Sequence, residues 1–184
     1  YKDKYPNIRM ERRDGILQIA FHTDGTSLKW RPAVPGVEID GGSPQQDLGY
    51  AFTDIGSDSE NKVVIMTGTG DKFIAVSDTP RPLRKTAGDW DYIYWLTKRN
   101  IMAFLDIEVP IISAINGPVE NHTEVPVLCD IVLASENATF RDATHFPAGV
   151  VPGDGVQIVW PLLLGLNRAR YFLLTGQTLT AQRA

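Results

Sequence analysis

Lys62-Val-Val-Ile-Met-Thr-Gly-Thr-Gly-Asp-Lys-Phe73 opens with a continuous apolar run that ends in glycine at position 68. Such a run is typical of a parallel strand buried on both faces. Two more runs of this kind follow, Ile111-Ile-Ser-Ala-Ile-Asn-Gly117 and residues 131–134. Between the first two, apolar residues from Trp90 to Leu105 recur at helical spacing. Strands that alternate with helices predict an α/β fold.

Shorter patterns add a hairpin and further helices to this scheme. The dipeptide Asp14-Gly15 separates two short apolar runs and is a hairpin turn signal. Asn167 is the predicted N-cap of one helix, and Gly176 marks the predicted end of that helix. Thr178 is followed by helix formers and predicts the start of a last helix. The additional elements expected are strands at 7–13 and 15–21 and helices at 46–55, 154–164 and 167–175.

Two loops interrupt these elements. Residues 31–46 carry three prolines and three glycines, a composition that predicts a mobile loop. Residues 76–89 hold prolines and basic side chains and predict a second loop. The chain stops inside the helix expected after Thr178, so the sequence reads as one domain, 1–184, truncated in a C-terminal helix.

Length and composition narrow the function classes. The 184 residues fit one domain with a sizeable core. A net charge of −4 and a pI near 5.3 argue against a nucleic-acid-binding surface. No stretch approaches the roughly 20 apolar residues that cross a bilayer. The single cysteine, Cys129, lies in an apolar run, so we expect a buried thiol and a cytoplasmic protein.

The chemistry-bearing residues gather in two turn-rich stretches. Asn116-Gly-Pro-Val-Glu-Asn-His122 holds one histidine, and His145-Phe-Pro-Ala-Gly-Val-Val-Pro-Gly-Asp154-Gly holds a second and an acid. Gly68-Thr-Gly70 tempts a dinucleotide-binding interpretation, but Phe73 stands where the third glycine belongs. The histidines lack metal-ligand spacing, and no metal or organic cofactor is expected.

The order of five motifs resembles the crotonase (enoyl-CoA hydratase/isomerase) superfamily. They are the runs at 62–73 and 111–117, Cys129-Asp-Ile-Val-Leu-Ala-Ser-Glu-Asn-Ala-Thr-Phe140, Pro152-Gly-Asp-Gly155 and Leu174-Thr-Gly-Gln-Thr-Leu-Thr-Ala181. The resemblance implies a crotonase-like β-β-α spiral core and a homotrimer or dimer of trimers. It also implies a C-terminal helical region, which is absent from this chain.

Departures from the family pattern argue against ordinary hydration of a CoA thioester. Family members hold the thioester oxyanion with two backbone N–H groups from glycine-containing stretches. Here those stretches read Ile74-Ala-Val-Ser-Asp78 and Asn121-His122-Thr123. The positions of the two hydratase glutamates fall at Val125 and near Thr144.

The same departures, together with Ser27-Leu-Lys-Trp30, resemble β-diketone hydrolases of the 6-oxocamphor hydrolase type. That resemblance implies retro-Claisen hydrolysis of a cyclic or bicyclic β-diketone to a keto acid. It implies that His145, oriented by Asp154, activates water, and that His122 and Trp30 bind a carbonyl oxygen. The only expected partner besides copies of the chain is a small-molecule diketone, with no nucleic acid and no membrane.

These roles suit the residue types. The ordinary pKa of histidine, near 6.5, suits water activation, and a carboxylate can orient the ring. Donors such as His122 and the Trp30 indole can hold the enolate that C–C cleavage expels. Structural alternatives stay open: Asp154 as a helix cap, His122 as another, and Glu120 and Glu124 as solvated charges.

Two other functions also stay open at this point. One is a crotonase-fold enzyme that acts on a CoA ester. The other is a catalytically silent oligomeric binding or scaffold protein, whose mark would be a filled pocket around His122. The proline- and glycine-rich loop at 31–46 could produce that outcome by displacing Trp30.

Overall fold

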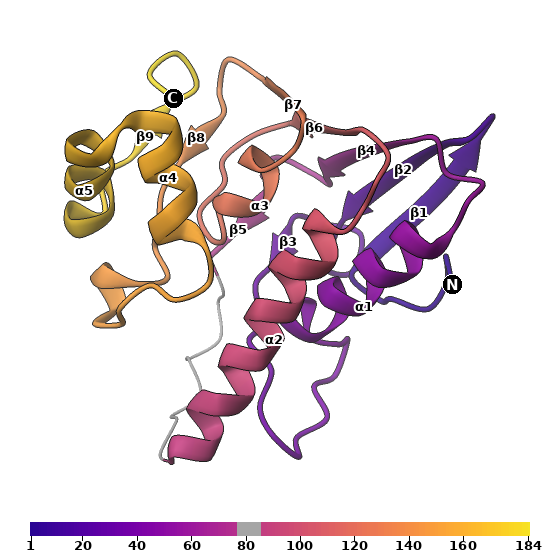
Figure 1. Cartoon of the computed structure of the whole chain (residues 1–184), viewed down its shortest axis with the longest axis horizontal. Coiled ribbons are helices and arrows are strands. Elements are labelled where there is room, and N and C mark those ends of the chain that lie inside the picture. Colours follow the sequence, from indigo (N-terminus) through magenta and orange to yellow (C-terminus); the bar gives the residue numbers. More distant parts are fainter. Residues whose placement is uncertain (77–85) are drawn as a thin grey trace.

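The computed structural model describes residues 1–76 and 86–184 and confirms the α/β class (Figure 1). The strands are β1 (Ile8–Arg13), β2 (Ile16–Phe21), β3 (Leu28–Lys29), β4 (Val63–Gly68), β5 (Ile74–Ala75), β6 (Ile111–Ile115), β7 (Ile131–Ala134), β8 (Thr139–Phe140) and β9 (Leu179–Thr180). The helices are α1 (Pro44–Ser57), α2 (Ala87–Leu105), α3 (Glu124–Val127), the 3₁₀ turn η1 (Phe146–Ala148), α4 (Val156–Leu164) and α5 (Leu166–Thr175).

The main sheet has five strands in the order β1-β2-β4-β6-β7. Strands β1 and β2 are antiparallel, whereas β2, β4, β6 and β7 are parallel neighbours. Asp14 and Gly15 have positive φ angles of 53° and 82°, as a two-residue hairpin turn requires, so the predicted hairpin is confirmed. The apolar runs at 62–73 and 111–117 supply β4 and β6 inside this sheet.

Two groups of helices pack around the sheet and its loops. Helices α1 and α2 lie side by side, and the rings of Phe52 and Phe104 meet edge to face between them, 5.2 Å apart. Helices α4 and α5 lie at the other end of the molecule from the β1–β2 hairpin (Figure 1). There the ring of Trp160 packs 4.8 Å from Phe172 and 5.6 Å from Phe140.

Two expected helix starts are wrong near the end of the chain. The residues after Thr178 form β9, which pairs antiparallel with β8 and buries Leu179. This pairing provides backbone partners that outweigh the local cap signal. Helix α5 has Gly165 as its N-cap rather than Asn167, because Gly165 both ends α4 and begins α5.

The helices α1 and α2 start earlier than expected. Ser43 caps α1, with its hydroxyl accepting from the N–H of Gln46, and the same hydroxyl donates to the carbonyl of Arg31 across the 31–46 loop. Thr86 and Asp89 form a capping box that starts α2. Most of the loop predicted at 76–89 lies outside the described residues. Among the described helices, none is both long and apolar enough to cross a membrane.

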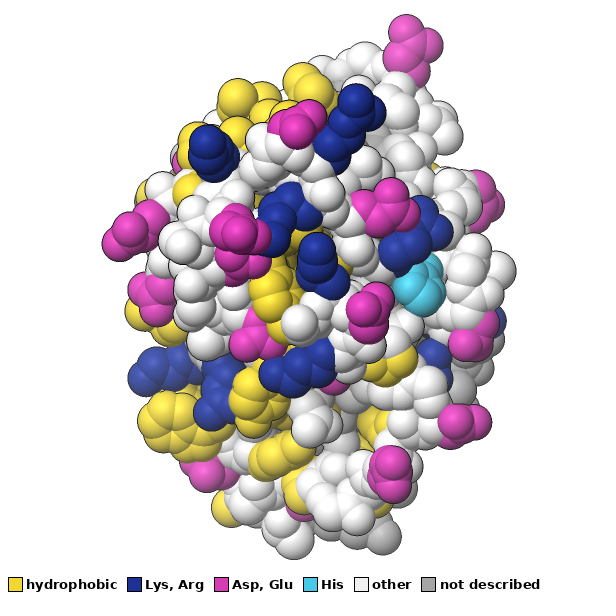
Figure 2. All heavy atoms as spheres, turned by 90° about the vertical axis from the view of Figure 1, so that its right-hand side faces the viewer, with side chains coloured by type: hydrophobic (Ala, Val, Ile, Leu, Met, Phe, Trp, Pro, Cys, Tyr) yellow, Lys and Arg dark blue, Asp and Glu magenta, His cyan; other side chains and the backbone are white. Residues whose placement is uncertain are grey.

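Opposite charges intermingle on the face that carries the β1–β2 hairpin and α1 (Figure 2). Arg12 of β1 pairs with Asp58 and Glu60 just after α1, and Lys4 pairs with Asp54 at 3.0 Å. These pairs join the start of the chain to the end of α1. Cys129 is buried, as predicted.

Gly117 allows two segments to approach closely beyond the end of β6. A Cβ at this position would lie 2.1 Å from the carbonyl oxygen of Asp71, so backbone would have to move. We expect Gly117→Ala to lower the free energy of unfolding by about 3 kcal/mol, which urea unfolding measures. Gly88→Ala in α2 is the matched control, since its nearest neighbour would be Thr86 at 3.7 Å. Equal losses in both variants would contradict this account.

Candidate active site

A cavity of about 440 Å³ lies beside the predicted site residues. This volume suits a small organic molecule. Trp30, His122, His145 and Asp154 all line the cavity, so the fold brings together four residues that are far apart in the sequence. The cavity around His122 is open, whereas a catalytically silent protein was expected to have a filled pocket there. Its other wall is largely apolar and includes Trp90, Ile93, Tyr94, Val150 and Val151.

Trp30 stays in the site despite the loop that follows it. Its side chain is buried, and its ring lies over that of His122 with a centroid distance of 3.8 Å and a tilt of 37°. The N–H of Ala33 donates to the side-chain oxygen of Gln45 at 3.0 Å, which ties the two ends of the loop together. The displacement of Trp30 by residues 31–46 therefore does not occur.

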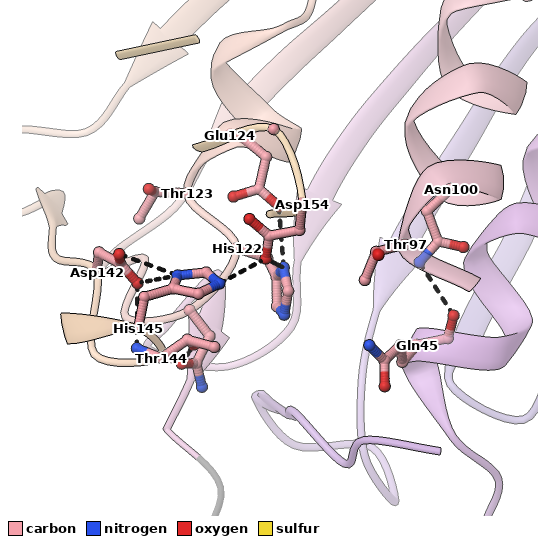
Figure 3. Close-up of polar contacts among 12 residues, drawn as sticks. Gln45, Thr97, Asn100, His122, Thr123, Glu124, Asp142, Thr144, His145 and Asp154 are labelled. Atoms are coloured by element: carbon pink, nitrogen blue, oxygen red, sulfur yellow. Dashed lines mark hydrogen bonds and ion pairs between the residues drawn. The ribbon is translucent and has the colours of Figure 1, made fainter. Parts of the chain in front are cut away.

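His145 is held between two carboxylates (Figure 3). Its Nδ1 lies 2.9 and 3.0 Å from the two oxygens of Asp142, and its Nε2 lies 2.9 Å from Asp154 Oδ2. Carboxylates accept hydrogen bonds, so both ring nitrogens donate and the ring is an imidazolium. Burial lowers the pKa of His145, but hydrogen bonds and charges from Asp142 and Asp154 outweigh it and raise the pKa to about 10.

Asp142 is a site residue that the sequence reasoning missed. It follows β8, is buried, and also accepts from the N–H of Thr144 at 3.1 Å. This local turn fixes the carboxylate three residues before His145. The sequence feature that could have indicated Asp142 is this spacing, since an acid and a histidine lie three residues apart in a turn-rich loop.

His122 is held from its Nδ1 side. This atom lies 2.9 Å from Glu124 Oε1 and 3.3 Å from Asp154 Oδ2, while the other ring nitrogen points away from both carboxylates (Figure 3). The backbone of His122 is left-handed, with φ of 47°. Burial lowers the pKa of His122, but Glu124 and Asp154 outweigh it, so the pKa is raised.

Glu124 is buried, so the expectation of a solvated helix-start charge is wrong for this residue. Burial and the charge of Asp154 raise the pKa of Glu124 above its usual range. Glu120 behaves differently, because it pairs with Lys72 at 2.8 Å. The two glutamates that flank His122 thus have different surroundings.

Asp154 joins the two histidines and also interacts with the backbone of Val156 at the start of α4, whose N-cap is Gly155. Its Oδ2 contacts both rings, and its Oδ1 is buried with no hydrogen-bond partner among the described residues. Burial raises the pKa of Asp154, but the hydrogen bond from His145 and the charges of His122 and His145 outweigh it. The pKa of Asp154 is therefore lowered, and the group is ionised.

Acids and histidines alternate through the site in the order Asp142, His145, Asp154, His122, Glu124. Carboxyl groups at the ends and centre of this series thus flank the two histidine rings. His122, Glu124 and Asp154 also have ligating atoms within 4.8 Å of one another, a spacing that could hold a metal ion. In this structure His122 Nδ1 contacts both carboxyl groups.

Comparisons with known proteins agree with this architecture. The Enoyl-CoA hydratase/isomerase family profile matches residues 44–184. The chain belongs to the enoyl-CoA hydratase/isomerase family. A probable peroxisomal enoyl-CoA hydratase 1 from Arabidopsis thaliana is 34% identical over 139 residues, 75% of this chain and 51% of that protein. A short-chain-enoyl-CoA hydratase from Clostridium acetobutylicum is 29% identical over 141 residues, 76% of this chain and 54% of that protein.

Solved structures of this family superpose on nearly the whole chain. A β-diketone hydrolase from the cyanobacterium Anabaena sp. PCC 7120, bound to (S)-3-oxocyclohexyl acetic acid, has a TM-score of 0.88 and 45% identity. The match covers 98% of this chain and 69% of that one. An enoyl-CoA hydratase from Bacillus anthracis has a TM-score of 0.76 at 23% identity, covering 96% and 65%, and shares the crotonase fold. The chain spans about half the length of the curated relatives it matches.

Proposed function

We propose that the protein hydrolyses the C–C bond between the two ketone carbonyls of a cyclic or bicyclic β-diketone and releases a keto acid. The observation that carries this proposal is the Asp154 carboxylate, which contacts both His145 and His122 at the wall of a largely apolar cavity. The 45% identity to a β-diketone hydrolase supports the same reaction class. The substrate is a small diketone, and the reaction requires no metal or organic cofactor.

Water is activated by the pair of His145 and Asp154. Both nitrogens of His145 are engaged by carboxylates, whereas Asp154 Oδ1 has no hydrogen-bond partner among the described residues. The contacts therefore favour the Asp154 carboxylate as the group that takes the proton, with His145 as the imidazolium that holds it in place. Water attacking a carbonyl becomes more acidic as the new C–O bond forms, so an oriented carboxylate suffices as its acceptor.

C–C cleavage then places negative charge on the second carbonyl. The tetrahedral intermediate collapses, the C–C bond breaks, and its electron pair forms an enolate. His122, through the ring nitrogen that faces away from the carboxylates, and the Trp30 indole N–H supply the donors for that oxygen. The enolate carbon takes the proton from Asp154, which restores the carboxylate.

A second candidate is a reaction on a CoA ester, which the names of the curated relatives favour. Hydration in that class needs two glutamates. One of their positions corresponds to Val125, which is buried in the core. The other falls near Thr144, whose hydroxyl bonds to Asn121. Neither position carries a glutamate, and this absence weakens the second candidate.

Turnover of a bicyclic β-diketone tests the proposal. We expect the diketone to disappear and one equivalent of keto acid to form, as measured by liquid chromatography and mass spectrometry. Crotonyl-CoA serves as the parallel substrate for the second candidate. Hydration of crotonyl-CoA without any loss of the diketone would overturn the proposed function.

A further inference from the structure

Glu124 is a buried carboxyl group with no role in the proposed reaction steps. Its side chain is 2% exposed, its Oε1 lies 2.9 Å from His122 Nδ1, and its Oε2 has no partner among the described residues. Burying an ionised carboxylate is costly unless a charge of opposite sign lies beside it. His122 is the group that supplies such a charge within contact distance.

The contacts of His122 determine which ring nitrogen carries hydrogen. Nδ1 faces Glu124 Oε1 at 2.9 Å and the ionised Asp154 carboxylate at 3.3 Å, so with Glu124 ionised Nδ1 carries a hydrogen. A neutral imidazole has only one ring hydrogen. With that hydrogen on Nδ1, a neutral ring would present a bare Nε2, which repels a carbonyl oxygen. Nε2 can donate only when the ring holds a second proton.

We propose that Glu124 is a positioning residue that keeps His122 doubly protonated, so that its Nε2–H donates to the substrate carbonyl oxygen. This inference rests on the proposed function, which places that oxygen at His122. The charged groups that face His122 are Glu124 at the start of α3, Asp154 before α4, and the His145 ring, whose centroid is 6.4 Å away. Asp154 contacts both His145 and His122, whereas Glu124 contacts only His122 of the two histidines.

The surrounding structure fixes this pair. Thr123, between the two residues, accepts from the indole N–H of Trp160 at 2.7 Å. Gly155 at the start of α4 lies against Glu124, since a Cβ there would be 3.8 Å from Glu124 Cγ. The backbone of His122 is left-handed, and its side chain lines the cavity. These contacts fix the position of Glu124 next to His122.

Glu124→Gln tests the inference, with Glu120→Gln as the matched control. The substitution keeps the shape of the side chain and removes its charge, which lowers the pKa of His122. We expect diketone turnover to be retained at acid pH and to fall as pH rises, by about 10²-fold near pH 8. Glu120 pairs with Lys72, so its Gln variant should keep the wild-type pH profile. A purely structural role would give a loss that is equal at every pH and would overturn the inference.

Ring-nitrogen NMR of His122 separates this inference from the proposed function. We expect a doubly protonated ring in the wild-type protein near neutral pH and a lower pKa in Glu124→Gln. A singly protonated wild-type ring overturns the inference even when the variant does not fold. A doubly protonated ring that depends on Glu124, without diketone turnover, supports the role of Glu124 and overturns the function.

Discussion

Asp154→Asn is expected to reduce kcat/KM for the diketone by about 10⁴-fold, an effect comparable to replacing the carboxylate of a catalytic His–Asp pair. Asn keeps the shape of the side chain, but its amide cannot accept the proton of the attacking water. It also removes the charge that Asp154 Oδ2 presents to His145 at 2.9 Å and to His122 at 3.3 Å. Steady-state kinetics measure the loss.

A matched acid-to-amide change is available outside the cavity. Asp54 bonds to Lys4 and Tyr5 near the start of the chain, and Asp54→Asn should leave kcat/KM unchanged. Thermal unfolding of both variants separates loss of activity from loss of fold. An Asp154→Asn protein that is folded and still turns over at the wild-type rate would remove Asp154 from the mechanism.

His145→Ala is expected to lower kcat/KM by about 10³-fold and to destabilise the fold. The change leaves the carboxylates of Asp142 and Asp154 buried without the ring between them. Their mutual repulsion raises the pKa of Asp154, so the proton acceptor is lost. Breaking a buried ion pair costs about 3–5 kcal/mol, which urea unfolding measures. His22→Ala is the control, because the His22 ring lies outside the cavity and accepts a long hydrogen bond, 3.4 Å, from the Gly25 N–H.

The pH dependence of the wild-type protein follows from the same charges. The pKa of His145 is raised to about 10, so its stabilising charge is fully present below about pH 6.5 and is lost as pH rises through 10. The lowered pKa of Asp154 keeps that acceptor ionised at neutral pH. We expect kcat/KM to be level from about pH 6 to 9 and to fall near 10. A neutral His145 acting as the base would give a rate that rises toward pH 10 instead.

Continuous apolar runs made the sheet predictable from the sequence. Strands β4, β6 and β7 occupy the predicted runs. Burial between neighbouring strands explains the apolar residues of β4 and β6, but β7 lies at the edge of the sheet and its residues are exposed, so the expectation of burial is wrong for this strand. Strand β9 was not predictable, since its partner β8 lies some forty positions away and the local residues favour a helix start. Pairing with β8 decides its conformation.

Four site residues were predictable by resemblance, and two acids were not. His122, His145, Asp154 and Trp30 line one cavity, although their individual roles stay proposals. The sequence predicts a solvated charge at Glu124 because acids favour helix starts, but its side chain packs against Gly155 of a later segment. The homotrimer or dimer of trimers, the cytoplasmic location and the mobility of loop 31–46 stay predictions.

The most direct test of the proposed function follows the oxygen of the attacking water. The protein and a bicyclic β-diketone are mixed in water labelled with heavy oxygen, and the product is examined by mass spectrometry. We predict a keto acid whose new carboxyl group carries one labelled oxygen, with no such product from Asp154→Asn. An unchanged diketone, or a keto acid formed equally by Asp154→Asn, would contradict the proposed mechanism.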